Sequence, residues 1–366
     1  ALYILSSICY ILALFSKEMA ATFPLLLLLW GLLMNHRDKS GTTTINNLLK
    51  TTRIVSGYVV VTTIYFVSYT HYFKAIEKFP FLKWTVKESL ITLPSTLLKY
   101  VKLVVMPFSL SADYPVFPIS KLLTYRFIMP FITLLLLGLL IYRLSQSEKA
   151  NYRMAAFGMT FFFVSLLPAS NLIPIYNPMA ERYLYLPMAG ACIAAGIALS
   201  HCQKQCTLAW LVLPLFIIMN YSVLTVSSSK IWENDLMLWS DTIKKIPNSG
   251  KGHFGLGNAY RNMMRIDDAI HEYEIAKRIN PHYVENRFNL GSCYAHKGLL
   301  EKAQLEYEEV LRMNPRDLFA AYRLGGIYFD RGLYQQSLHV SRRILALNPN
   351  DRYAREMIEA IQTKLR

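Results

Sequence analysis

The chain has 366 residues, of which 53% are hydrophobic and only 17% are charged, whereas a soluble domain carries about 25% charged residues. This composition excludes a single soluble globular domain and indicates that part of the chain lies in a lipid bilayer. The net charge of +15 does not indicate nucleic-acid binding, because much of the lysine and arginine flanks apolar segments. Basic residues there mark cytoplasmic loops and attract anionic lipid, so membrane lipid is the expected partner.

Residues 1–229 hold nearly all the apolar runs and predict a polytopic transmembrane helical bundle. The segments lie near residues 1–15, 19–34, 54–73, 127–142, 154–168, 184–200 and 208–226. Because backbone polar groups in lipid must be satisfied within the segment, each segment is expected to be a helix. The first run has 15 residues, short of the roughly 20 of a full span. No basic region precedes it, so we interpret the chain as starting inside a membrane domain.

Residues 88–107 predict an amphipathic helix that does not simply cross the bilayer. Polar residues recur there at about one helical turn, namely Glu88, Ser89, Thr92, Ser95, Thr96, Lys99 and Lys102. Two lysines on one face disfavour full immersion in lipid, so this segment is expected at the interface, dipping in and out, or lining a polar cavity. If it does not cross, the positive-inside rule places the loops at 16–18, 109–125 and 169–183, together with the C-terminal third, on the noncytoplasmic side.

The C-terminal third shows a repeat. Pro247, Pro281, Pro315 and Pro349 are each 34 residues apart, as are Leu256, Leu290 and Leu324. This period is the signature of tetratricopeptide repeats and predicts an α-solenoid. Three repeats are expected at 250–283, 284–317 and 318–351, with a capping helix at 352–366. Residues 230–249 are expected to form a half-repeat that joins the array to the last membrane helix.

The concave face of such an array is suited to extended peptide. The residues on or near the first-helix positions that line this face are Asn258, Arg261, Asn262, Asn289 and Tyr322. They are the candidate peptide-binding residues. The alternative interpretation is that each belongs to an ordinary solvated helix face.

Three polar clusters lie beside the membrane segments, where polar residues are costly unless they function or are paired. They are "SKEMAATFPLLLLL", "MPFSLSADYP" and "LLPASNLIPIYNPMAERYLYLP". Arg182 pairing with Glu181 or anchoring at the interface, and Lys17 pairing with Glu18, remain structural alternatives. Asp113 lies in "SADYP", which is also favourable turn chemistry.

The clearest match to a known family is "PASNL" followed by "AERYLYLP", with "SKE" and "PFSLSADY" upstream and the repeats downstream. In these segments the sequence resembles the transmembrane and tetratricopeptide-repeat O-mannosyltransferases and their bacterial relatives, in the GT-C class of glycosyltransferases. The resemblance implies that a sugar, with mannose as the candidate, is transferred from a polyprenyl-phosphate donor to a protein acceptor on the noncytoplasmic side. It covers most of the chain.

The resemblance also implies roles for the polar clusters. Arg182, whose guanidinium can grip a phosphate by two hydrogen bonds, and then Lys17 are the candidates for the donor phosphate. Asp113 and Glu181 are the candidate acids or bases. Glu18, Asn171, Tyr183 and Tyr185 are expected to line the site. In this class the catalytic carboxylate lies in the first outward loop, and the chain is expected to start after that loop, so that it lacks this residue.

Several alternatives stay open. A membrane-anchored scaffold whose repeats recruit partners would need no donor lipid, and a polymerase or ligase of lipid-linked glycans would need a large outward loop with Arg and His that we do not find. The compartment is expected to be the bacterial inner membrane with the repeats in the periplasm, or else the endoplasmic reticulum membrane with the repeats in the lumen. No metal site is predicted, since His201, Cys202 and Cys206 supply only three donors.

Overall fold

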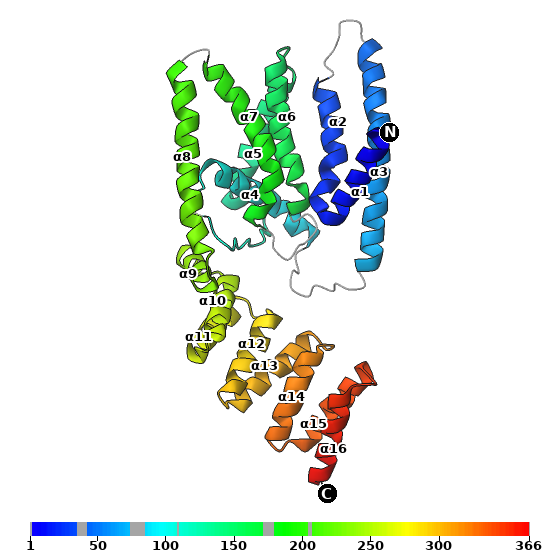
Figure 1. Cartoon of the computed structure of the whole chain (residues 1–366), viewed down its shortest axis with the longest axis vertical. Coiled ribbons are helices and arrows are strands. Elements are labelled where there is room, and N and C mark those ends of the chain that lie inside the picture. Colours follow the sequence, from blue (N-terminus) through cyan, green and yellow to red (C-terminus); the bar gives the residue numbers. More distant parts are fainter. Residues whose placement is uncertain are drawn as a thin grey trace. The chain divides into compact units, whose positions relative to one another are not determined.

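The computed structural model describes residues 2–34, 42–73, 85–107, 110–170, 179–203 and 207–365. Every regular element within these ranges is a helix, which confirms the all-α prediction. The contacts divide the chain into two compact units (Figure 1), Ala1–Leu110 with Tyr114–Ser228 and Ser111–Asp113 with Ser229–Arg366. Each unit is described by itself below.

The first unit contains helices that overlap all seven predicted apolar segments. Their bounds are α1 Leu2–Ser16, η1 Glu18–Thr22, α2 Phe23–Met34, α3 Thr42–Phe73, α4 Val86–Val105, α5 Tyr125–Ser145, α6 Ala150–Ser165, η2 Leu167–Ala169, η3 Glu181–Leu184, α7 Tyr185–Gln203 and α8 Thr207–Ile231. In the described residues, Tyr125–Ser145, Ala150–Ala169 and Glu181–Ser200 are long and apolar enough to cross a membrane. Leu5–Ser16 and Met19–Met34 are shorter apolar helices. The chain is a membrane protein.

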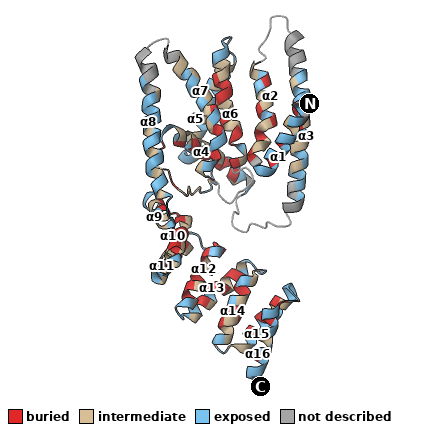
Figure 2. Cartoon of the chain, in the orientation of Figure 1, coloured by how far each residue is buried: buried red, intermediate tan, exposed pale blue. Residues whose placement is uncertain are grey.

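The outward faces of these helices are apolar. Helix α5 buries none of its residues, and its exposed side chains include Leu135, Leu136 and Leu139. Figure 2 shows the same exposure along much of α8. A water-soluble protein rarely exposes so large a contiguous apolar surface, whereas hydrocarbon chains cover it without cost, so this surface faces lipid.

Helices α6 and α7 pack backbone against backbone at two glycines. A Cβ atom added to Gly190 would lie 2.4 Å from the carbonyl oxygen of Gly158, and one added to Gly158 would lie 2.9 Å from the backbone nitrogen of Ala194. The pair Gly190 and Ala194 thus forms a small-xxx-small motif, which lets two membrane helices approach closely. This pair of helices fixes the position of η3, which leads directly into α7.

Helix α1 is held against α3 by tyrosines. The Tyr58 hydroxyl donates to Ser6 Oγ at 2.8 Å, and the hydroxyls of Tyr10 and Thr62 are 2.6 Å apart. The rings of Tyr10 and Tyr58 meet edge to face at 5.3 Å. Polar bonds of this kind join helices in lipid, where the hydrophobic effect does not.

Helix α4 begins at Val86 because Thr85 and Glu88 form a capping box. Thr85 Oγ1 accepts from the Glu88 N–H at 3.2 Å, and Glu88 Oε2 accepts from the Thr85 N–H at 2.9 Å. The hydroxyl-bearing part of the predicted polar stripe faces the protein interior, since Thr92 is buried and its Oγ1 accepts from the Ile119 N–H at 2.9 Å. Among the described helices, α4 does not meet the combination of length and hydropathy typical of a membrane-spanning helix.

The second unit is a solenoid of antiparallel helix pairs that confirms the tetratricopeptide prediction. Its helices are α9 Asp235–Lys245, α10 Gly250–Asn262, α11 Ile266–Ile279, α12 Val284–His296, α13 Leu300–Met313, α14 Leu318–Asp330, α15 Tyr334–Leu347 and α16 Arg352–Leu365. The turns between paired helices place Met264, Gly298 and Gly332 at positive φ. Glycine accepts this conformation freely, whereas Met264 occupies it at a cost.

Hydrogen bonds between neighbouring repeats recur with the sequence period. The Tyr294 hydroxyl donates to Glu274 Oε1 at 2.5 Å, and 34 residues later the Tyr328 hydroxyl donates to Glu308 Oε1 at 2.7 Å. Burial raises the pKa of both tyrosines above the ordinary value, so the hydroxyls remain donors. Each repeat is therefore locked to its neighbour by the same bond, as expected for a solenoid built from nearest-neighbour interfaces.

Candidate functional site

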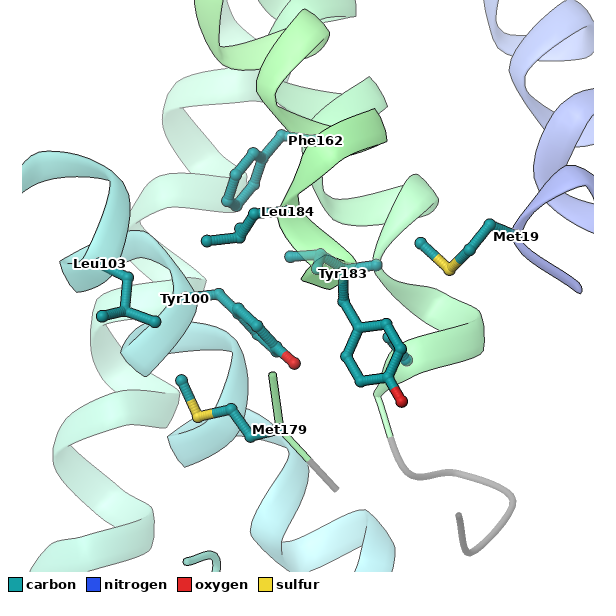
Figure 3. Close-up of a cluster of buried hydrophobic side chains, with 9 residues drawn as sticks. Met19, Tyr100, Leu103, Phe162, Met179, Tyr183 and Leu184 are labelled. Carbon is teal, nitrogen blue, oxygen red and sulfur yellow. The ribbon is translucent and has the colours of Figure 1, made fainter. Parts of the chain in front are cut away.

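One buried cluster joins the three polar segments that the sequence singled out. Figure 3 shows Met19 from η1, Tyr100 and Leu103 from α4, and Tyr183 and Leu184 from η3 around the same core. Tyr114, which follows Asp113, packs against this cluster. Segments around residues 17, 114 and 182 are thus brought together within the first unit, although they lie far apart in the sequence.

Glu181 and Arg182 occupy η3, where they have different partners. The Tyr114 hydroxyl donates to Glu181 Oε1 at 2.5 Å. Arg182 is exposed and forms no ion pair with any residue that the structure describes, so the alternative in which it pairs with Glu181 is not what the geometry shows. Its guanidinium lies over the Tyr183 ring, 5.3 Å from the centroid. An exposed arginine without a carboxylate partner can bind an external anion.

The remaining candidates of this region are less closely placed. Lys17 caps η1 with an extended backbone and an exposed side chain, and Tyr185, at the start of α7, is 82% exposed. Tyr183 is buried in the shared cluster. Asn171 and the side chain of Glu18 lie outside the described residues, as do residues 204–206 and the side chains of His201 and Cys202.

Asp113 belongs to the repeat unit. Its Oδ2 accepts from the Ser249 hydroxyl at 2.7 Å, and the same Ser249 oxygen accepts from the Gly252 N–H at 2.7 Å. Ser249 is the N-cap of α10, so Asp113 supports the first turn of the repeat array. This bond was not predicted from the sequence, in which Asp113 lies in one of the clusters beside the membrane segments.

An apolar pocket of about 720 Å³ opens beside η1. It is lined by residues of α1, η1, α2, α6 and α7, including Tyr10, Met19, Trp30, Phe157 and Leu186. Met19 is common to this pocket and to the buried cluster. An apolar volume that adjoins a set of polar residues suits a ligand with an apolar chain and a polar head.

Two of the five concave-face candidates are engaged with each other. Asn258 Oδ1 accepts from the Tyr273 hydroxyl at 2.6 Å and from Asn289 Nδ2 at 2.9 Å. Asn262 is exposed at the end of α10, and Arg261 is half-buried without an ion pair to any described residue. Asn258 and Asn289 therefore tie two repeats together.

The fifth candidate, Tyr322, supports the capping helix. Its hydroxyl donates to Asp351 Oδ2, while Asp351 Oδ1 accepts from the Ala354 N–H at 2.9 Å at the start of α16. Its ring lines a groove of about 910 Å³ whose other residues include His296, Phe319, Arg323, Asp330 and Tyr353. Those residues were not predicted from the sequence, although they lie on first helices of the repeats or on the capping helix.

The Asp351 bonds predict a pH dependence. The hydrogen bond from Tyr322, followed by that from Ala354, holds the pKa of Asp351 below its ordinary value. The Asp351 carboxylate therefore stabilises α16 fully at a pH above the ordinary aspartate pKa. This stabilisation is lost as the pH falls through the lowered pKa of Asp351. Amide hydrogen exchange in α16 should accelerate over that acidic range. In Asp351→Asn the exchange should be faster at neutral pH and this pH dependence should vanish; an unchanged profile would contradict the assignment.

A metal site is not evident. Within the part of the chain that the structure describes, no group of three or more His, Cys, Asp or Glu side chains could hold a metal ion.

Comparisons with known proteins agree with this architecture. A family model for the tetratricopeptide repeat matches residues 254–306 and 300–352. Protein O-mannosyl-transferase TMTC1 of Homo sapiens is 26% identical over 163 residues, which cover 42% of this chain and 18% of that protein. Protein O-mannosyl-transferase F38B6.6 of Caenorhabditis elegans is 29% identical over 195 residues, which cover 51% of this chain and 27% of that protein. The chain is related to the tetratricopeptide-repeat O-mannosyltransferases.

Other similarities concern parts of the chain. Protein O-mannosyl-transferase TMTC4 of Mus musculus is 28% identical over 38% of this chain and 19% of its own length. The chain thus spans less than a third of each of these O-mannosyltransferase relatives. Among solved structures, MamA is 18% identical with a TM-score of 0.34 over 36% of this chain and 76% of MamA. YrrB is 16% identical with a TM-score of 0.35 over 40% of this chain and 75% of YrrB.

Proposed function

We propose that this chain is part of a membrane glycosyltransferase that transfers a sugar, with mannose as the candidate, from a polyprenyl-phosphate donor to a protein acceptor. The observation that carries the proposal is the convergence of the η1, Tyr114 and η3 segments on one buried cluster beside an apolar pocket. The relation to O-mannosyltransferases supports the reaction class. The repeats supply a module of the kind that binds proteins or peptides.

The parts of the site match the parts of the donor. The apolar pocket beside η1 receives the polyprenyl chain, and Arg182 holds the phosphate, which gains negative charge as it leaves. Lys17 adds a second cation from the start of η1. In the transfer, the acceptor oxygen bonds to the anomeric carbon, the bond from that carbon to the phosphate breaks, and the phosphate keeps the electron pair.

A carboxylate must take the proton of the acceptor hydroxyl. Glu181 adjoins Arg182 on η3 and is oriented by the Tyr114 hydroxyl, so it is the better placed of the two candidates. Asp113 is bound to Ser249 at the start of the repeats and is the second candidate. If α4 does not cross the membrane, the positive-inside rule places the site on the noncytoplasmic side. The repeats then lie in the periplasm of a bacterium or in the lumen of the endoplasmic reticulum.

The proposal predicts that Arg182→Ala in the full-length protein reduces sugar transfer at least about hundredfold, because an unneutralised phosphate is a poor leaving group. Transfer of radiolabelled mannose from polyprenyl-phosphate mannose to membrane-associated acceptor proteins measures this. Arg143→Ala is the control, since Arg143 is also exposed near a helix end but lies in α5, away from the cluster. Equal transfer by both variants would remove Arg182 from the site.

The second candidate function is a membrane-anchored scaffold, which the inter-repeat bonds and the peptide-sized groove favour. A scaffold needs no donor lipid. Binding of polyprenyl-phosphate mannose by the purified full-length protein, measured in nanodiscs with and without Arg182→Ala, separates the two functions: a scaffold shows no donor binding that depends on Arg182.

A further inference from the structure

The groove of the last two repeats, which we call the terminal groove, is built mainly on one face of α14. It is lined by Ser292, Ala295, His296, Leu300, Tyr307, Phe319, Tyr322, Arg323, Gly326, Ile327, Asp330 and Tyr353. The α14 residues follow one another at three- and four-residue spacing and therefore share a face. Its volume of about 910 Å³ is large enough for several side chains of a ligand.

Exposed aromatic rings form one part of this groove. Phe319 is 74% exposed, and the rings of Tyr322 and Tyr353 meet edge to face at 5.3 Å. Gly326 lies close to Tyr353, since a Cβ atom added there would be in ordinary van der Waals contact with the Tyr353 hydroxyl at 3.5 Å. An apolar ligand side chain that covers the exposed Phe319 ring removes it from water, which stabilises the complex.

An unneutralised cation forms the second part. Arg323 is exposed and makes no ion pair or hydrogen bond with any described residue, whereas Arg287 and Arg331 in the same array pair with carboxylates. Asp330 also lines the groove, but it lies seven residues further along α14, about 10 Å away along the axis. No ion pair joins the two. The groove thus offers a free cation beside the aromatic rings.

We propose that the terminal groove binds an extended peptide segment that places an acidic side chain on Arg323 and an aromatic or large aliphatic side chain on Phe319 and Tyr353. The inference rests on the proposed function insofar as this segment belongs to the protein acceptor. It selects among acceptors by a motif separate from the hydroxyl that receives the sugar. Arg323 repels a basic side chain at this position, and a groove of this volume suits an extended peptide better than a flat protein surface.

The test is fluorescence anisotropy with the full chain in detergent micelles and a short labelled peptide that carries two aspartates beside one phenylalanine. We expect saturable binding that weakens as salt screens the charge. Arg323→Gln and Phe319→Ala should each weaken binding about tenfold, the loss of one charged contact or one covered ring. Both side chains are exposed, so neither substitution is expected to unfold the repeats. Arg342→Gln, on α15 outside the groove, should bind as the parent chain does.

Charge reversal makes the test specific. A peptide with lysines in place of the aspartates should bind about tenfold less tightly to the parent chain and should regain affinity for Arg323→Glu. The inference is overturned if the lysine peptide binds as well as the aspartate peptide, if neither Arg323→Gln nor Phe319→Ala changes binding, or if Phe319 instead mediates self-association of the chain. Transfer without such peptide binding refutes this inference alone, whereas peptide binding without transfer refutes only the glycosyltransferase proposal.

Discussion

Replacing Glu306 by glutamine is expected to lower the free energy of unfolding of the repeat unit by about 3 kcal/mol. The Glu306 side chain is only 7% exposed and pairs with Lys277 at 2.5 Å and Arg287 at 2.8 Å. It thus joins α11, α12 and α13, which belong to two successive repeats. The neutral amide leaves two cations facing each other, and Arg287 is too buried to be solvated fully. The loss arises from that unpaired charge more than from the hydrogen bonds themselves.

Amide hydrogen exchange of α13 in the full chain measures this loss, since about 3 kcal/mol corresponds to roughly hundredfold faster exchange where opening is the limiting equilibrium. Glu301→Gln is the matched control, because Glu301 also pairs with an arginine of the next repeat, Arg331, but is 82% exposed. Exposed pairs contribute about 0–1 kcal/mol. Similar exchange rates in the two variants would show that the buried pair does not hold the repeats together.

Gly190→Val should disrupt the membrane unit, with an expected cost of about 2–3 kcal/mol. The new Cβ would lie within 2.4 Å of the Gly158 carbonyl oxygen and 2.7 Å of the Phe162 backbone nitrogen. Both obstacles are backbone atoms, which cannot rotate away, so α6 and α7 must separate. Because η3 leads directly into α7, the position of Arg182 should change with them.

Gly196→Val, in the same helix, controls for the change in helix propensity, since a Cβ there meets nothing within 4 Å. A titration with denaturing detergent, followed by near-ultraviolet circular dichroism of the purified chain, compares the two variants. The expected order is a clear loss of stability for Gly190→Val and little change for Gly196→Val. Equal stability would mean that α6 and α7 do not pack through these glycines.

The candidate site was only partly predictable. "AERYLYLP" and "SKE" are visible in the sequence because polar residues beside apolar runs are rare, and the structure places both segments at one buried cluster. Tyr100 could not be foreseen, since it lies between Lys99 and Val101 in a segment that was interpreted through its polar stripe. The partners of Asp113 and Tyr322 were also hidden, because Ser249 and Asp351 are distant in sequence.

The sequence by itself determined that one part of the chain lies in lipid and the other in water, that the fold is helical, and that the repeats have a period of 34 residues. Each of these follows from a local pattern, because an apolar run in lipid must form a helix and a repeated unit buries its apolar face on its neighbour. The tertiary structure decided which polar side chains are satisfied within the protein and which stay available. Asn258, Asn289 and Tyr322 resemble ligand contacts in the sequence, yet Asn258 and Asn289 bond to each other across two repeats and Tyr322 bonds to Asp351 beside the capping helix. Arg182 and Arg323, in contrast, remain without ion pairs among the described residues. Pairing depends on distances between elements remote in the chain, and no local pattern encodes those distances.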